Sequence, residues 1–188
     1  MESAALMQKV SIIGQGYVGL TISAFTSKHF KVVGFDNNHK IVTQLNNGIS
    51  HIEGIESALI ASAVKSGNYR ATSNPADIAG SDVVVIAVPT PLTKDRKPDL
   101  AFIEAACKTI AENLTGPALI INESTSFPGT IRNYIKPAIE KNSQVKFEHE
   151  YAISPERVDP GRDDFNQKNT PRLYAGLTPQ ATERTREF

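Results

Sequence analysis

The sequence predicts an α/β fold, a doubly wound parallel sheet with helices on both faces, in a single domain. Short apolar runs that suit buried strands alternate along the chain with helical segments. A glycine-rich turn joins the first apolar run to the first helical segment. The chain has 188 residues, 40% of them hydrophobic, which suits one globular domain of roughly 100–200 residues.

The first half of the chain contains two short apolar runs and several helical segments. We expect strand 10–13, helix 17–29, strand 31–35, helix 39–47 and helix 56–66, in that order. Asn74-Pro75 then combines a capping side chain with a proline suited to the first helical position. This pair predicts the start of another helix.

The second half has the longest apolar run and the clearest helix. Residues 83–88 are apolar and mostly β-branched, as expected of a strand buried on both faces. A helix opened by Pro98-Asp99 has apolar side chains at spacings of three and four, namely Leu100, Ile103, Cys107, Ile110 and Leu114. Later elements are expected as strand 118–121, helix 129–141, and strands 151–154 and 172–175. Since strands that alternate with helices are joined by right-handed crossovers, the sheet should be parallel.

The domain is expected to cover residues 1–176. Residues 177–188 are polar, and we interpret them as a C-terminal tail that begins a truncated linker or helix, with a frayed or artificial end.

Composition argues against several classes of protein. Lysine and arginine number 20, as do aspartate and glutamate, and the sequence pI is about 6.9, so the basic excess of a nucleic-acid or membrane-surface binder is missing. One cysteine excludes an internal disulfide, and the four histidines show no metal-site spacing. Residues 1–9 do not resemble a signal peptide, and the run 83–88 is far shorter than the roughly 20 residues that span a bilayer. We therefore expect a cytoplasmic protein with no nucleic-acid, membrane or metal partner.

The glycine-rich turn has the pattern of a dinucleotide site. Gly14, Gly16 and Gly19 follow a predicted strand directly and open a helix. Gly14 would permit the tight turn, Gly16 would let the backbone approach a pyrophosphate, and Gly19 would let helix and strand pack closely. The helix N-terminus adds free N–H groups and a positive dipole end, so residues 14–19, with Gln15, Tyr17 and Val18 among them, are predicted to bind a cofactor.

A carboxylate stands where such a site would need one. Asp36 ends the second strand, 17 residues after Gly19, near the spacing expected for a contact with adenosine ribose. Because a carboxylate would repel a 2′-phosphate, the predicted cofactor is NAD and not NADP. The alternative is a plain glycine turn with a solvated aspartate.

Four short segments then occur in a fixed order along most of the chain. They are GQGYVGL at 14–20, VPTP at 88–91, EST at 123–125 with PGT at 128–130, and SPER at 154–157. In order and spacing they resemble the nucleotide-sugar 6-dehydrogenases, the UDP-glucose/GDP-mannose dehydrogenase group. TPLT at 90–93 with KPDL at 97–100, and ERVDPG at 156–161, look most like the branch that acts on UDP-N-acetylhexosamines.

The resemblance implies a reaction and a set of site residues. A sugar C6 alcohol would be oxidised by NAD to an aldehyde, then through a cysteine thioester to an acid, for surface-polysaccharide synthesis. Thr125 and Glu156 would act on the acid–base side. The cofactor site would include Val88, Pro89, Thr90, Ser124 and Thr125. The UDP-sugar site would begin with Glu156, Arg157, Val158 and Gly161, and the full-length enzyme would be a homo-oligomer.

Each of these residues also has a simpler interpretation. Prolines at 89 and 91 could merely end a strand. Ser124 and Thr125 could cap a helix or a turn, and Glu156 could be an exposed acid in a loop. Arg157 could be a surface arginine instead of a residue that contacts the substrate. Two departures from the family pattern stand beside these: Ile41, preceded by Lys40, occupies a position that is usually basic, and Pro160 replaces an acid found in some members.

Cys107 is not expected to be the family's thiolate. It shares a helix face with four apolar residues, which predicts a buried, inert thiol. The family's catalytic cysteine and lysine would lie beyond this chain, which should then bind NAD without turning over substrate. The alternatives are a fragment of a UDP-glucose 6-dehydrogenase, a non-catalytic NAD-binding or regulatory module, and a hydroxyacid dehydrogenase of related fold.

Overall fold

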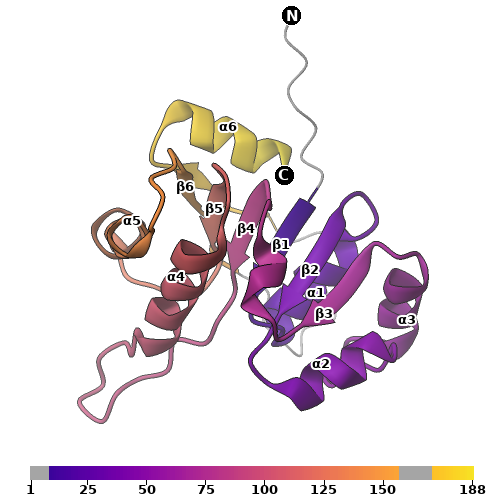
Figure 1. The fold of residues 1–188 in the computed structure, drawn as a ribbon. Coiled ribbons are helices and arrows are strands. Elements are labelled where there is room, and N and C mark those ends of the chain that lie inside the picture. Colours follow the sequence, from indigo (N-terminus) through magenta and orange to yellow (C-terminus); the bar gives the residue numbers. More distant parts are fainter. Residues whose placement is uncertain (1–8, 157–170) are drawn as a thin grey trace, which may run out of the picture.

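The computed structural model describes residues 9–156 and 171–188. Within these residues seven strands form one sheet, in the order β3-β2-β1-β4-β5-β6-β7 (Figure 1). All neighbours are parallel except β6 and β7, which are antiparallel. The strands are β1 (Lys9–Ile13), β2 (Lys31–Phe35), β3 (Tyr69–Thr72), β4 (Val83–Ile86), β5 (Leu119–Asn122), β6 (Glu150–Ile153) and β7 (Ala175–Gly176). The predicted doubly wound α/β fold is confirmed.

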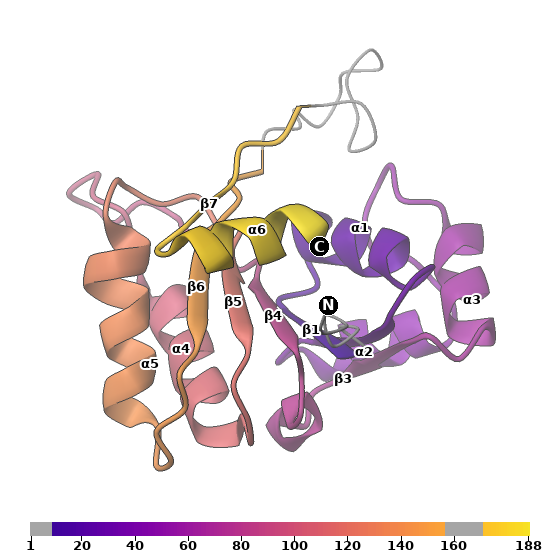
Figure 2. The same cartoon turned by 90° about the horizontal axis from the view of Figure 1, so that it is seen from above.

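Helices cover both faces of the sheet (Figures 1 and 2). They are α1 (Tyr17–Thr26), α2 (His39–Asn46), α3 (Ser57–Lys65), α4 (Ala101–Asn113), α5 (Lys136–Asn142) and α6 (Pro179–Glu187), with a 3-10 turn η1 (Pro75–Ile78) and a π-helical turn η2 (Ile131–Ile135). One apolar cluster joins one face of the sheet to α1, α2, α3 and α6, and a second joins the other face to η1, α4, η2 and α5. Burial on both faces explains why the central strands are almost wholly apolar.

The chain reverses direction across the sheet between β1 and β4. From β1 it winds outward through β2 to β3, then returns to β4 and winds the other way through β5 to β6. The connections that leave the carboxyl ends of β1 and β4 therefore run in opposite directions, and they separate near the middle of the sheet. Ligands of open α/β sheets bind at such a point, outside the carboxyl ends of the strands.

Several expected boundaries differ from the structure. Strand β3 was not predicted, because Tyr-Arg-Ala-Thr is short and carries an exposed arginine at the edge of the sheet. The helix expected at Asn74-Pro75 is the single turn η1, and the one expected over 129–141 divides into η2 and α5. Strand β7 has two residues, fewer than the expected 172–175.

Residues 177–188, expected as a polar tail, contain helix α6. Pro179 stands in its first turn and the Thr178 hydroxyl accepts a hydrogen bond from the Ala181 N–H, so the helix starts with a regular cap. Ala181 and Thr185 are buried, and α6 packs against β5, β6 and β7 (Figure 2). A narrow stripe of small residues thus docks a helix whose other side chains are polar.

Among the described residues, no helix combines the length and apolar character needed to cross a membrane.

Candidate functional site

The glycine-rich turn sits at the carboxyl end of β1, where the strand order reverses. Gly14 has a φ of 93°, and a Cβ there would lie 2.6 Å from the Ala87 carbonyl oxygen. A Cβ on Gly19 would lie 1.9 Å from the Gly14 carbonyl oxygen, so α1 packs on the turn only without a side chain there. A Cβ on Gly16, by contrast, would meet nothing within 4 Å. The fold therefore requires Gly14 and Gly19, while the space beside Gly16 is open to a ligand.

Helix α1 begins at this open space. Its N-cap is Gly16, which has no side chain to cap the helix, and its first turn carries no acidic residue. The N–H groups and positive dipole end of the first turn are consequently available to an anion. A pyrophosphate fits both the opening and the charge.

Asp36 lies beside the turn, at the end of β2. One oxygen of its carboxylate accepts a hydrogen bond from the Gln15 N–H (2.9 Å) and the other from the Asn38 N–H (2.9 Å). These bonds fix the carboxylate, and its remaining lone pairs can accept hydrogen bonds from ribose hydroxyls. The position matches the predicted role of Asp36 in NAD binding.

Gln15 takes part in the site through its backbone. Its side chain is fully buried, donates to the Ile12 and Gly14 carbonyls, and accepts from the hydroxyls of Ser23 (3.0 Å) and Tyr69 (2.9 Å). Of the predicted cofactor residues, Gln15 therefore contributes a structural side chain that ties β1, α1 and β3 together.

Burial and charge also act on His51, in the loop between α2 and α3. Burial lowers the pKa of its imidazole, and the nearby Asp36 carboxylate opposes this by raising it. No pattern in the sequence indicates that His51 lies near Asp36.

A hollow of about 240 Å³ opens between the turn and the ends of β4, β5 and β6. It gathers most of the residues predicted for the cofactor and for catalysis. Its lining includes Gly16, Tyr17, Val18, Val88, Pro89, Thr90, Ser124, Thr125 and Glu156, together with Ala87 and Glu123. We call this hollow the nucleotide pocket.

Hydrogen bonds hold the β4 and β5 sides of the nucleotide pocket together. Ser124 is buried, and its hydroxyl accepts from the Val88 N–H (2.9 Å). Thr125 is exposed on the lining. The Thr90 hydroxyl oxygen is buried and has no hydrogen-bond partner within residues 9–156 and 171–188. A buried hydroxyl in this condition is suited to a ligand contact.

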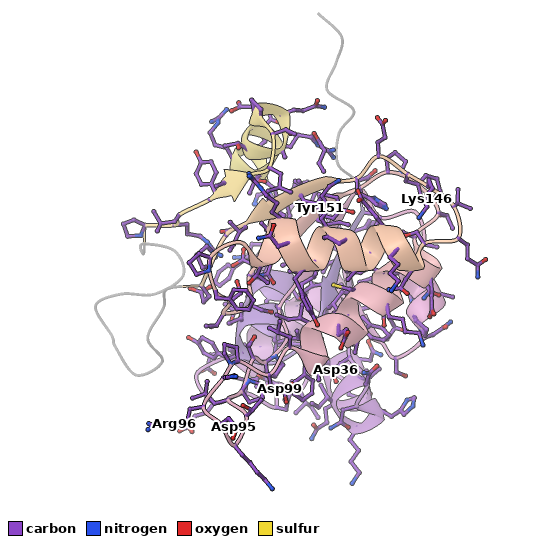
Figure 3. All side chains as sticks on the ribbon, turned by 90° about the vertical axis from the view of Figure 1, so that its left-hand side faces the viewer. Asp36, Asp95, Arg96, Asp99, Lys146 and Tyr151 are labelled. Carbon is purple, nitrogen blue, oxygen red and sulfur yellow. The ribbon has the colours of Figure 1, made fainter. Side chains whose placement is uncertain are left out.

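Beyond Thr90 the chain forms a small hairpin that leads into α4. Leu92 pairs with Pro98, and the Thr93 N–H donates to the Lys97 carbonyl (2.8 Å). Asp95 and Arg96 lie at its tip, away from the body of the domain (Figure 3). The TPLT and KPDL segments are thus the two sides of one hairpin beside the pocket.

Two carboxyl groups and one arginine meet at the β5 and β6 end of the nucleotide pocket. Glu123 follows β5 and is 5% exposed, and it forms an ion pair with Arg172. The other guanidinium nitrogen of Arg172 lies 3.4 Å from a carboxylate oxygen of Glu156, which follows β6. We call Glu123, Arg172 and Glu156 the Glu–Arg–Glu cluster.

Burial raises the pKa of Glu123 to about 7. The nearby Glu156 also raises it, whereas Arg172 and the Ser154 hydroxyl act in the opposite direction. The EST segment contains Glu123, for which the motif predicts no role of its own, although an acid directly after a buried strand can indicate a functional residue. Arg172 is 49 residues away along the chain, so no local spacing could have paired the two.

Cys107 is on α4, fully buried in the apolar cluster of the opposite face of the sheet. Burial raises the pKa of its thiol to about 12, and the Glu104 carboxylate adds to the effect. The predicted inert thiol is confirmed. In the described part of the chain, no group of three or more His, Cys, Asp or Glu side chains is arranged to hold a metal ion. Arg157, Val158, Pro160 and Gly161 fall outside the described residues.

Residues 8–188 match the UDP-glucose/GDP-mannose dehydrogenase family, NAD binding domain. The chain belongs to this family. The family resemblance and the choice of NAD as the cofactor are thereby confirmed at the level of the domain.

Individual relatives agree with this assignment. The chain is 35% identical to the UDP-N-acetyl-D-mannosamine dehydrogenase of Escherichia coli (strain K12), over 95% of this chain and 44% of that protein. It is 31% identical to the UDP-N-acetyl-D-glucosamine 6-dehydrogenase of Pseudomonas aeruginosa, over 93% of this chain and 41% of that protein.

Solved structures are similar as well. The UDP-D-ManNAc dehydrogenase of Pyrococcus horikoshii superposes with a TM-score of 0.86 at 30% identity, covering 96% of this chain and 44% of that one. A UDP-glucose dehydrogenase of Pyrobaculum islandicum gives 0.85 at 27% identity, covering 98% and 44%. The chain thus spans less than half the length of the relatives it matches.

Proposed function

We propose that this chain is the NAD-binding part of a UDP-N-acetylhexosamine 6-dehydrogenase. The complete enzyme would oxidise the C6 alcohol of UDP-GlcNAc or UDP-ManNAc to a carboxylate for surface-polysaccharide synthesis. The observation that carries the proposal is the nucleotide pocket, which gathers the glycine-rich turn, Thr90, Thr125 and Glu156 at the carboxyl ends of the strands. The UDP-N-acetylhexosamine branch is supported by the relatives named above.

The chain's own residues offer a complete path for NAD. Asp36 would accept hydrogen bonds from the adenosine ribose, and the first turn of α1 beside Gly16 would hold the pyrophosphate. The other half of the cofactor would then extend past β1 toward Val88, Thr90 and Ser124. Bound there, NAD supplies the hydride acceptor for the oxidation of the sugar.

Thr125 and Glu156 are proposed to serve acid–base chemistry. The Thr125 side chain is exposed on the pocket lining, so its hydroxyl can reach a substrate oxygen. Glu156 also lines the pocket, and Arg172 orients its carboxylate. This carboxylate could help activate the hydrolytic water. Arg157, Val158 and Gly161 stay predicted contacts of the UDP-sugar.

Turnover needs a thiolate that the described part of the chain does not supply. Cys107 is buried on the far side of the sheet, so it cannot form a thioester in the nucleotide pocket. We propose that the catalytic cysteine and lysine belong to the region that the longer relatives have in addition. A cytoplasmic location and a homo-oligomeric full-length enzyme belong to the same proposal.

The test is an assay of the 188-residue chain with NAD and UDP-ManNAc, UDP-GlcNAc or UDP-glucose. We expect no sustained NADH production with any of the three sugars. Sustained NADH production would contradict the proposal that the chain lacks essential catalytic groups. A longer native gene product, detected by intact mass in its own cells and containing a further cysteine, should produce NADH with a UDP-N-acetylhexosamine.

A second candidate is a non-catalytic NAD-binding module. The burial of Cys107, the one cysteine of the sequence, favours it. A native gene product with the mass of this chain, 20.4 kDa, would favour the module. In a longer enzyme, preference for UDP-glucose would instead indicate the UDP-glucose branch.

A further inference from the structure

The Glu–Arg–Glu cluster joins three segments that are far apart in the sequence. Arg172 precedes β7, and its guanidinium contacts Glu123 after β5 and Glu156 after β6. The same guanidinium lies 3.4 Å from the Ser154 carbonyl and 3.3 Å from its hydroxyl. Both glutamates line the nucleotide pocket. The cluster is therefore fixed by contacts among three segments, and it forms part of the pocket wall.

The cluster holds one positive charge for two carboxyl groups. Ionisation of Glu123 makes the cluster more negative by one charge. Glu123 is 5% exposed and the Glu156 side chain 11%, so the burial of charge weighs more heavily on Glu123. Its raised pKa, about 7, makes Glu123 the member that gains or loses a proton near neutral pH.

Within residues 9–156 and 171–188, few other charged groups face Glu123. Glu123 also lines a second hollow of about 470 Å³ between α1 and α6, where the other titratable side chains are Arg172, Tyr174 and Arg186 among the described residues. Arg186 is paired with Glu183 on its own helix. Across the nucleotide pocket the only further titratable side chain of the described lining is Tyr17.

Glu123 directly follows β5, so it lies near the expected position of the nicotinamide half of the cofactor. This step rests on the proposed function, in which the adenosine half lies at Asp36 and the nicotinamide half lies over β4 and β5. The nicotinamide ring carries a positive charge in NAD⁺ and none in NADH. An ionised carboxylate in a partly buried wall interacts more strongly with a cation than it would in water.

We propose that Glu123, held by Arg172 beside Glu156, is a charge-sensing residue that selects the oxidised form of the cofactor. Ionised Glu123 adds one negative charge to the pocket wall, and this charge favours the cationic ring. Binding of NAD⁺ to the protonated protein then releases one proton from Glu123 to solvent, and no other bond forms or breaks. NADH brings no ring charge, so its binding leaves the proton in place.

The test is calorimetric titration of the chain with NAD⁺ and with NADH between pH 6 and pH 8. If only the ionised form of Glu123 binds NAD⁺ well, the Kd for NAD⁺ should fall about tenfold over this range, while that for NADH changes less than about twofold. At pH 7, titrations in two buffers of different ionisation enthalpy should show about 0.5 proton released per NAD⁺ bound. NADH is the internal control, since both forms share the adenosine half near Asp36 and His51.

Two variants separate the cluster from the rest of the protein. Glu123→Gln keeps the shape of the side chain and cannot ionise, so its Kd for NAD⁺ should follow the shallow pH profile of NADH, without proton release. Glu148→Gln, an exposed acid before β6 at the opposite edge of the sheet, should behave like the wild type. Arg172→Met removes the charge that lowers the pKa of Glu123, so the midpoint of the NAD⁺ profile should move to higher pH.

The outcomes are distinct. Parallel pH profiles for NAD⁺ and NADH, or no proton release with NAD⁺, would overturn the charge-sensing role while leaving cofactor binding in place. Failure of the folded chain to bind either form would overturn the proposed function itself. If Glu123→Gln does not fold, as judged by circular dichroism, the proton count of the wild type decides the matter.

Discussion

At the scale of single residues, burial decides what each polar side chain can do. Gln15 looks like part of the cofactor site in the sequence, yet its side chain is fully buried and bonded to Ser23 and Tyr69. Asp36 directly follows β2, and its carboxylate keeps lone pairs available at the surface of the turn. Of these two residues, only Asp36 has a side chain that is free to contact a ligand in the proposed cofactor site.

Asp36 gives a prediction about cofactor choice. Asp36→Asn should weaken NAD binding by about 1.5–3 kcal/mol, roughly 10–100-fold in Kd, because a charge-assisted hydrogen bond to ribose is lost. The same change should weaken NADP binding less, since the repulsion of the 2′-phosphate disappears. Fluorescence titration with both cofactors measures this. Equal loss for NAD and NADP would show that the Asp36 charge does not discriminate between them.

Glu123 gives a prediction about stability. Its pKa of about 7 lies above the ordinary value of 4.5, so the folded state binds more protons than the unfolded state between these values. Stability relative to Glu123→Gln should therefore fall as pH rises, by about 2 kcal/mol between pH 5 and pH 8. Urea unfolding of both proteins at each pH provides the measurement. A difference that stays constant with pH would show that Glu123 does not titrate in this range.

At the scale of elements, the glycine-rich turn separates folding from binding. Gly14 and Gly19 have no room for a side chain, whereas Gly16 faces open space. Two of the three glycines are thus fixed by packing, and the third is left for the ligand.

Gly16→Ala should fold normally and bind NAD poorly. The φ of −70° suits alanine, so the free energy of unfolding should change by less than about 1 kcal/mol. The added methyl would occupy the space of the pyrophosphate, so the Kd for NAD should rise at least about tenfold, a cost on the order of 1.4 kcal/mol. Gly116→Ala, also in open space but before β5 at the opposite edge of the sheet, is the matched control. Unchanged affinity in Gly16→Ala would place the phosphates elsewhere.

Helix α6 carries a second prediction at this scale. Ala181→Glu should lower the free energy of unfolding by about 2–4 kcal/mol, because it would force a charge into the contact with the sheet. Gln180→Glu, one residue earlier and exposed, should stay within about 0.5 kcal/mol of the wild type. A harmless Ala181→Glu would mean that α6 is not docked, as expected of a frayed tail.

The sequence predicts elements best where one pattern dominates. Strands β1, β2, β4 and β5 are nearly continuous apolar runs, and α4 shows a regular apolar face that correctly buries Cys107. Strand β3 was missed because an edge strand needs little apolar sequence. The ion pair of Glu123 with Arg172 was missed because it depends on the order of strands in the sheet. Local patterns therefore predict the layers of the fold, while long-range contacts come from topology.

At the scale of the whole molecule, the strand order explains why distant motifs meet. The turn after β1, the loops after β4 and β5, and Glu156 after β6 all lie at the carboxyl ends of neighbouring strands. Parallel strands place these ends along one edge, so four separate segments share one pocket. The family assignment fits this arrangement, because the matching family is an NAD binding domain.

We propose that the isolated chain binds NAD in the nucleotide pocket. The most direct measurement is a titration of the isotope-labelled chain with NAD, followed by amide chemical shifts in two-dimensional NMR spectra. We predict saturable shifts at Gly16, Tyr17, Val18, Thr90 and Ser124, with little change near Gly116. No saturable shift, or shifts confined to the hollow between α1 and α6, would contradict the account.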